Sequence, residues 1–139
     1  MKLKEIMALN VETVGPDATL QEAADKMKRR DIGVLPVVEG KKPIGVVTDR
    51  DITLRAVASG ADVTKTKVRE VMTREPQLVY EDQTINEACE LMEKNKIRRL
   101  VVLNRQGALV GILSLNDVTI KGKESARSAE VLRKIAAAA

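Results

Sequence analysis

The chain lacks most of the side chains on which enzymes depend. Its 139 residues include no His, Trp or Phe, one Cys and one Tyr. Without His, the chain can build neither a His/Cys metal site nor a Ser/His/Asp or Cys/His catalytic group, and one Cys cannot form an internal disulfide. We therefore expect no catalysis by this chain, no metal site and no required cofactor.

Long apolar runs are also missing. The first residues, MKLKEIM, do not form the apolar stretch of a signal peptide. No run approaches the ~20 residues that cross a bilayer. A lone thiol fits a reducing compartment. These features predict a cytoplasmic protein without a membrane partner.

The charge is mixed rather than strongly basic, with 24 Lys and Arg against 20 Asp and Glu. Two basic clusters fall at the ends of predicted helices, where cations complement the helix dipole. Apart from one Tyr, the aromatic residues that stack on single-stranded nucleic acid are absent. Nucleic acid is therefore not the expected partner. The clusters are Lys26, Lys28, Arg29 and Arg30, and Lys94, Lys96, Arg98 and Arg99.

The chain contains a duplicated unit. A set of residues returns 65 positions later, and after a one-residue insertion a GxxTxxD motif returns 66 positions later as GxxSxxD. A repeat of this size buries little surface alone, so the two copies are expected to share a core. The first set is Thr19, Glu22, Ala23, Met27, Ile32, Leu35 and Val37, and the motifs are Gly45, Thr48 and Asp51, and Gly111, Ser114 and Asp117.

Each repeat is predicted to fold as βαββα. In the first, the capping box at Thr19 and Glu22 opens a helix that continues to about Arg30. β-Branched runs indicate buried strands, and Gly60 ends a second helix. The elements expected are strands at 12–14, 34–38 and 44–48 and a helix at 49–59, then strands at 78–80, 99–103 and 109–113 and helices at 84–95 and from 115.

The expected domains are residues 1–60 and 70–122, joined by a polar linker at 61–69. Residues 123–139 form a tail with a helix at about 128–138, whose Val131, Leu132 and Ile135 can pack back or mediate a contact. Cys89 falls on the apolar side of its helix and is expected to be a buried spacer.

The GxxTxxD motif admits two interpretations. A hydroxyl at a strand end lies beside the free N–H groups of a starting helix, which attract anions, and a carboxylate three residues later can accept hydrogen bonds from ribose hydroxyls. The same pattern is also a capping box, in which both groups only satisfy backbone N–H groups. The motif glycine either leaves space for a ligand or allows tight packing.

Tandem βαββα units with LPVV before a hairpin and GVVTDRDI or GILSLNDV after it closely resemble the CBS domain, and two such domains resemble a Bateman module. The resemblance covers about residues 6–120. It implies an α/β (α+β) fold of two pseudo-twofold-related domains that pack through their sheets. It also implies two clefts that bind adenosine-containing ligands.

The resemblance implies roles for particular residues. Asp51 and Asp117 correspond to ribose-binding positions. Phosphate contacts fall to Thr48, Ser114, Arg50, Arg98 and Arg99. Adenine contacts fall to Thr13, Val14, Ile32, Gly33, Leu78, Val79 and Ile97, although the apolar members can equally be core residues.

The two copies are not equivalent at the basic positions, because Gly33 and Val34 replace Arg98 and Arg99, and Asn116 replaces Arg50. The two clefts are therefore expected to differ in affinity. The expected function is regulation through an adenine nucleotide (AMP, ADP or ATP) or another adenosyl ligand, in a homodimer that acts on an unidentified partner. The alternative is a nucleic-acid-binding or purely structural dimerisation module without nucleotide.

Overall fold

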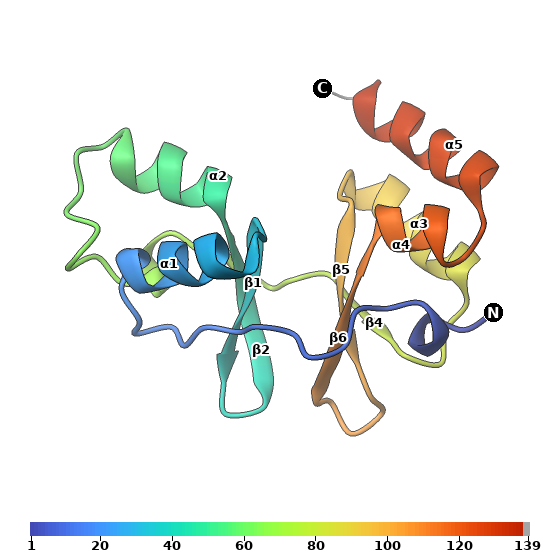
Figure 1. Ribbon diagram of the computed structural model, residues 1–139, viewed down its shortest axis with the longest axis horizontal. Coiled ribbons are helices and arrows are strands. Elements are labelled where there is room, and N and C mark those ends of the chain that lie inside the picture. Colours follow the sequence, from blue (N-terminus) through green and yellow to red (C-terminus); the bar gives the residue numbers. More distant parts are fainter. Residues whose placement is uncertain (138–139) are drawn as a thin grey trace. The chain divides into compact units, whose positions relative to one another are not determined.

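The structure, a computed structural model, describes residues 1–137, which form two compact units (Figure 1). Unit 1 combines Met1–Val11 with the chain from Gln77 onward, and unit 2 is Glu12–Pro76. Each unit contains one three-stranded sheet together with helices. The α/β class expected from the sequence is therefore confirmed.

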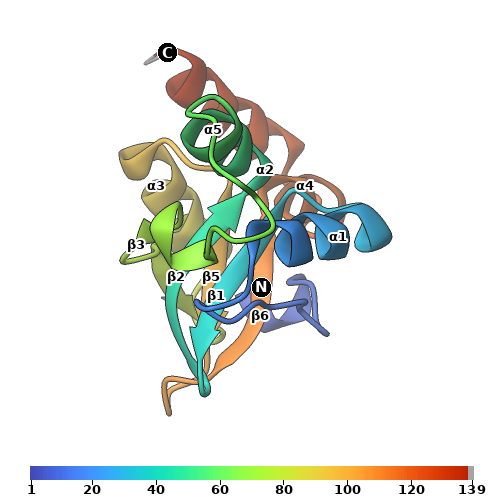
Figure 2. The same ribbon diagram turned by 90° about the vertical axis from the view of Figure 1, so that its left-hand side faces the viewer.

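Unit 2 carries most of the first repeat (Figure 2). Helix α1 (Leu20–Arg30) precedes the antiparallel strands β1 (Val34–Glu39) and β2 (Lys42–Thr48), and the short β3 (Thr73–Arg74) pairs with the free side of β2. The expected α-helix over 49–59 is wrong in type. Helix α2 (Asp49–Asp51) continues as a π-helical segment, Ile52–Val57, in which the Ala58 N–H donates to the Thr53 carbonyl at 3.0 Å.

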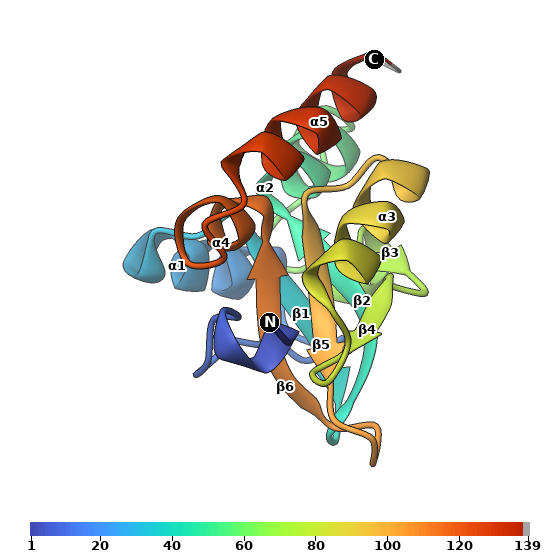
Figure 3. The same cartoon turned by 90° about the vertical axis from the view of Figure 1, so that its right-hand side faces the viewer.

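Unit 1 carries most of the second repeat (Figure 3). Strand β4 (Leu78–Tyr80) is parallel to β5 (Arg99–Leu103), and β5 is antiparallel to β6 (Leu109–Ser114). The helices are α3 (Ile85–Asn95), α4 (Leu115–Ile120) and α5 (Ser125–Ala136). The tail helix thus begins before the predicted residue 128, and residue 138 lies outside the described residues.

Each unit receives its first segment from the other repeat. The Leu3 N–H donates to the Gln83 carbonyl at 3.0 Å in unit 1, and the Val68 N–H donates to the Ala18 carbonyl at 2.8 Å in unit 2. These bonds are equivalent under the 65-residue repeat. The two segments, which we call the exchanged segments, share a Lys-x-x-Glu-x-Met pattern and span residues 2–7 and 67–72.

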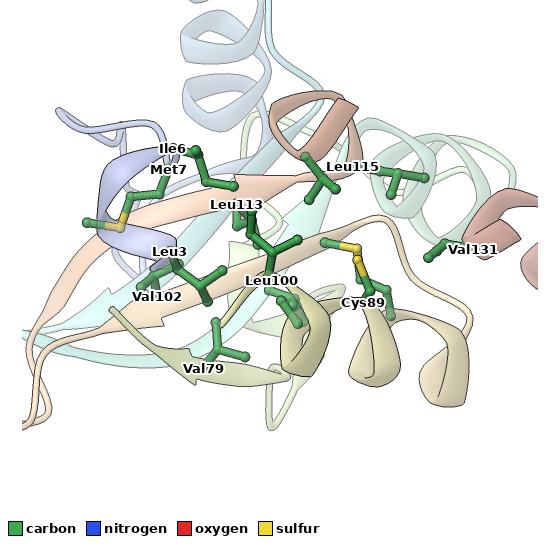
Figure 4. Packing of buried hydrophobic residues seen from close by; sticks show 14 residues of the cluster. Leu3, Ile6, Met7, Val79, Cys89, Leu100, Val102, Leu113, Leu115 and Val131 are labelled. Carbon is green, nitrogen blue, oxygen red and sulfur yellow. The ribbon is translucent and has the colours of Figure 1, made fainter. Parts of the chain in front are cut away.

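The exchanged segments contribute core side chains. Leu3 and Ile6 lie in the apolar cluster of unit 1 with Leu100 and Leu113 (Figure 4). Burial of each such side chain contributes roughly 1.5–3 kcal/mol. Val68, without exposed surface, has the same role in unit 2. The segment 61–69 was expected to be a polar linker. It belongs to unit 2 instead, and Val68, the counterpart of Leu3, packs in the core of that unit.

Both long repeat helices begin as the sequence predicts. The Thr19 Oγ1 accepts the Glu22 N–H at 3.2 Å, and Glu22 Oε2 accepts the Thr19 N–H at 2.9 Å. Thr84 and Glu87 form the same reciprocal pair. Two backbone donors at each helix start are thereby satisfied.

Helix α5 packs back onto unit 1. Val131 has no exposed surface, and Ile135 packs against the same apolar cluster, whereas Leu132 remains 45% exposed. Among the described residues, the helices are all too short or too polar to cross a bilayer.

Candidate ligand-binding site

The repeat motif of unit 2 forms a reciprocal capping box. Thr48 lies at the end of β2, where its Oγ1 accepts the Asp51 N–H at 3.0 Å, and Asp51 Oδ2 accepts the Thr48 N–H at 3.0 Å. The other carboxylate oxygen, Oδ1, lies 3.8 Å from Arg55 Nε. One oxygen of Asp51 is therefore used by the backbone, and the second contacts an exposed cation.

The motif of unit 1 repeats this geometry. The Ser114 Oγ accepts the Asp117 N–H at 3.1 Å, and Asp117 Oδ2 accepts the Ser114 N–H at 2.8 Å. Asp117 Oδ1 lies 3.5 Å from Lys121 Nζ. A carboxylate can accept about four hydrogen bonds. Capping therefore leaves acceptor positions on Oδ1 of both motif aspartates.

The motif glycines allow two backbones to approach. A Cβ at Gly45 would lie 2.7 Å from the Thr73 carbonyl oxygen, and one at Gly111 would lie 2.7 Å from Met7 Sδ and 2.9 Å from the Ala8 oxygen. In each unit the close neighbour belongs to, or directly follows, an exchanged segment. Of the two reasons considered for this glycine, the structure supports tight packing.

A pocket of about 160 Å³ opens beside the motif of unit 1. Arg98, Arg99 and Ser114 border it where β5 begins and β6 ends. Its volume lies below the ~300 Å³ at which pockets for drug-sized ligands begin, so it fits part of a nucleotide, such as its phosphate end. The remaining lining residues are Leu115, Asn116, Thr119, Ser128 and Leu132.

Arg98 and Arg99 provide the positive charge of this pocket. Both are exposed, and within residues 1–137 neither guanidinium group forms an ion pair or a side-chain hydrogen bond. A guanidinium group presents five N–H donors in a planar arrangement that matches phosphate oxygens. The pocket therefore suits an anion.

The hydroxyl groups of the pocket already donate hydrogen bonds within the protein. The Ser114 hydroxyl donates to Asp117 Oδ2 at 3.0 Å, and the Thr119 hydroxyl donates to the Leu115 carbonyl at 2.9 Å. Because the Thr119 proton is used, the 2.5 Å contact between Thr119 and Ser128 has Ser128 as its donor. Anion binding here therefore falls to Arg98, Arg99 and the Asn116 amide.

The equivalent part of unit 2 lacks the arginine pair and has a carboxylate near the position of Arg98. Gly33 stands in place of Arg98, and a Cβ at Gly33 would lie 3.0 Å from Asp49 Oδ2. Asp49 itself replaces the buried Leu115 and is exposed. Arg50 follows Asp49, and its backbone N–H donates to Asp49 Oδ1 at 2.8 Å. The position that is cationic in unit 1 is thus occupied by a carboxylate in unit 2.

The residues expected near adenine differ in how much of their surface is exposed to solvent. Val14 and Val79 are 4% and 2% exposed and belong to the two core clusters. Ile97 packs against the core of unit 1. Ile32 and Leu78, at 36% and 39%, present accessible apolar surface.

The predicted strand at 12–14 is reduced to one bridge, between Val14 and Val37. The Thr13 carbonyl instead accepts a hydrogen bond from Lys26 Nζ at 2.6 Å, and Glu12 pairs with Arg30. Side-chain contacts with α1 therefore hold residues 12–14 in place of further hydrogen bonds to β1.

Five of the eight pocket residues were not among the sequence-predicted site residues: Leu115, Asn116, Thr119, Ser128 and Leu132. Ser128 and Leu132 belong to α5, for which the sequence predicts packing or a contact rather than a ligand site. The available signal was a Ser in the apolar stripe formed with Val131 and Ile135, since Ser128 is 3% exposed. A buried polar residue in an apolar stripe indicates a specific hydrogen bond or a site.

The CBS domain family matches this chain twice, over residues 3–57 and 68–122. The chain therefore belongs to the CBS domain family as a tandem pair. CBS domain pairs are regulatory modules.

Individual relatives extend this assignment. The chain is 42% identical over 129 residues to the CBS domain-containing protein YhcV of Bacillus subtilis, covering 91% of each chain. It is 37% identical over 123 residues to inosine-5'-monophosphate dehydrogenase of Methanocaldococcus jannaschii, covering 88% of this chain but only 24% of that enzyme. The structure of CBS domain protein PAE2072 from Pyrobaculum aerophilum complexed with AMP is 29% identical, with a TM-score of 0.80, over 96% of this chain and 99% of that one.

Proposed function

We propose that this chain is a regulatory module without catalysis of its own that binds an adenine nucleotide or another adenosyl ligand. The observation that carries the proposal is the pocket of unit 1, where two arginines without partners in the described chain lie next to Ser114 of the repeat motif. The AMP complex of PAE2072 supports the choice of ligand class.

The phosphate end of the ligand is assigned to Arg98 and Arg99, since charge-assisted guanidinium hydrogen bonds to phosphate are short and strong. The ribose is assigned to Oδ1 of Asp117, which the capping box leaves with only the Lys121 contact at 3.5 Å. The base then extends beyond the 160 Å³ pocket and meets exposed apolar surface such as Leu78.

Calorimetric titration with AMP and adenosine tests this proposal. AMP is expected to bind the wild-type chain more tightly than adenosine does. Asp117→Asn should weaken binding of both, because Asn is a poorer acceptor for ribose hydroxyls. Asp51→Asn is the matched control in unit 2 and should leave the tighter site unchanged. Each variant should lose at most about 1 kcal/mol of stability, the scale of a helix cap.

Two results would refute the proposal. The first is the absence of binding heat and of thermal stabilisation at millimolar AMP, ADP and ATP, because a ligand of the native state must stabilise it. The second is strong destabilisation by Asp117→Asn with unchanged affinity, which would assign the motif to capping alone.

We also propose that the chain forms a homodimer. Leu54 and Val57 in unit 2 are 51% and 59% exposed, and Ile120 in unit 1 is 73% exposed. Ile52 and Val118, which lie in the same helical segments, are buried in the cores. Light scattering should give twice the chain mass, and Val57→Asp should reduce it. A monomer at tens of micromolar protein would contradict the homodimer.

A further inference from the structure

Helix α5 contributes to the pocket although it lies outside both matched CBS domains, the second of which ends at residue 122. Ser128 and Leu132 line the pocket from α5, while Arg99 and Ser114 line it from the strands. A ligand in this pocket therefore contacts two parts of unit 1, one belonging to the repeat and one added to it.

Apolar packing and ion pairs hold α5 in place. Val131 is its fully buried apolar side chain, and the Arg127 guanidinium group pairs with the Glu93 carboxylate on α3. Lys134 Nζ lies 3.3 Å from the other oxygen of Glu93. Local opening of such an element requires less free energy than unfolding of the whole unit.

A chain of hydrogen bonds links α5 to the repeat motif. Ser128 donates to Thr119, and Thr119 donates to the carbonyl of Leu115, the residue after Ser114. The position of α5 is thus connected to the first turn of α4, where the ligand-binding motif lies.

We infer that α5 forms one wall of the ligand site, contacted through Ser128 and Leu132, and that ligand binding and docking of α5 stabilise each other. The inference rests on the proposed function, because it concerns regulation of the same pocket. A ligand that touches both walls binds the docked form better, and linkage requires that it raise the docked population. Release of α5 then lowers the affinity for the ligand by the same factor by which the ligand favours docking of α5.

Cys89 is a natural reporter for α5. It is the single cysteine, has no exposed surface, and shares the core cluster with Val131 (Figure 4). Its counterpart in unit 2, Ala24, is exposed on α1. Burial raises the pKa of the Cys89 thiol, which further slows its reaction with a maleimide at neutral pH. Labelling of Cys89 therefore measures how often unit 1 opens around this helix.

The test measures maleimide labelling of the full chain with and without AMP, with AMP binding followed by calorimetry on the same preparation. Urea unfolding measured in parallel gives the labelling expected from global unfolding alone. Saturating AMP should slow the remaining, local labelling by at least about fivefold, the lower end of typical coupling factors.

Glu93→Gln tests the reverse direction, because it weakens α5 docking without touching the pocket. It should accelerate Cys89 labelling and weaken AMP binding. Asp25→Asn is the matched control, since it removes the exposed ion pair with Arg29 on α1 of unit 2, and it should change neither quantity. Ser128→Ala should weaken AMP binding in the same direction as Glu93→Gln.

The outcomes distinguish the coupling between α5 and the ligand from the proposed function itself. AMP binding with unchanged local labelling, or Glu93→Gln with faster labelling and unchanged affinity, would overturn the coupling and leave the proposed function standing. Absence of AMP binding in calorimetry would overturn both. Slower labelling with AMP and a matching loss of affinity in Glu93→Gln supports the inference.

Discussion

Units 1 and 2 share one backbone plan but differ at the surface around the repeat motif. In unit 1 the motif lies beside Arg98 and Arg99 and under an added helix. In unit 2 the same place holds Gly33 and the carboxylate of Asp49, and α1 carries exposed Ala24 where α3 carries buried Cys89. The two copies therefore share the capping residues and the motif glycine but differ in the charge beside the motif.

The largest expected effect comes from removing the charge that distinguishes unit 1. Arg98→Ala should lower AMP affinity about 10- to 100-fold, because hydrogen bonds to charged groups contribute about 1.5–3 kcal/mol. Adenosine affinity should change little, and part of the difference should disappear at high salt because exposed charges are screened. Calorimetry at two salt concentrations measures both effects.

Arg74→Ala is the control for this variant, since Arg74 is an exposed arginine on β3 of unit 2 and its loss changes the net charge equally. It should leave AMP affinity unchanged. Equal losses for AMP and adenosine in Arg98→Ala would show that the arginine acts on the structure rather than on phosphate.

The next largest effect concerns a feature that both units share. Gly45→Ala and Gly111→Ala should each destabilise the chain by about 1–3 kcal/mol, the usual cost of overpacking. Gly45→Ala should cost more, because its nearest neighbour is a backbone oxygen, whereas that of Gly111 is the flexible Met7 side chain, both at 2.7 Å. Urea unfolding measures the difference. Two neutral variants would contradict tight packing.

A smaller effect is expected from Asp49→Asn in unit 2. The amide oxygen can still accept the Arg50 N–H, while the negative charge beside Gly33 is lost. Phosphate-bearing ligands should bind the weaker site up to about fivefold more tightly, the scale of an exposed charge interaction. Calorimetry on the Arg98→Ala background isolates this site. Weaker binding would show that the carboxylate assists the ligand.

The smallest effect is the contribution of Glu93, in unit 1, to the pH dependence of stability. A side-chain hydrogen bond from Arg127, assisted by Lys134, lowers the pKa of Glu93 below its ordinary value. The stabilisation is therefore present above that ordinary value, about 4.3, and is lost as pH falls through the lowered pKa. Wild type should exceed Glu93→Gln in unfolding free energy by less than about 1 kcal/mol at pH 7. Urea unfolding should show this difference shrinking toward pH 3, and a constant difference would contradict it.

The local elements were predictable because their signals are local. The capping box at Thr19 and its repeat 65 residues later at Thr84 located two helix starts, and the β-branched runs located both hairpins. The exchanged segments were not predicted. Their Lys-x-x-Glu-x-Met pattern fits either unit equally well, so only the three-dimensional structure shows that residues 2–7 join the second repeat.

The site was predicted in part. The repeat motif pointed to Ser114, the resemblance to the CBS domain implied Arg98 and Arg99, and the structure places all three at one pocket. Neither the motif nor the resemblance could identify Ser128 and Leu132, because α5 has no counterpart in the first repeat. The use of hydroxyl protons within the pocket depends on distances that no sequence pattern encodes.

The exchanged segments also have a consequence for the order of folding during synthesis. Unit 2 is continuous in the chain, so all of its residues are available once residue 76 has left the ribosome. Unit 1 is discontinuous, and Leu3 cannot pack against β5 and β6 until both strands have been synthesised. Its core therefore closes over long sequence separations, which slows folding. We expect unit 2 to form first and the N-terminal segment to be the part most exposed to wrong partners in the nascent chain.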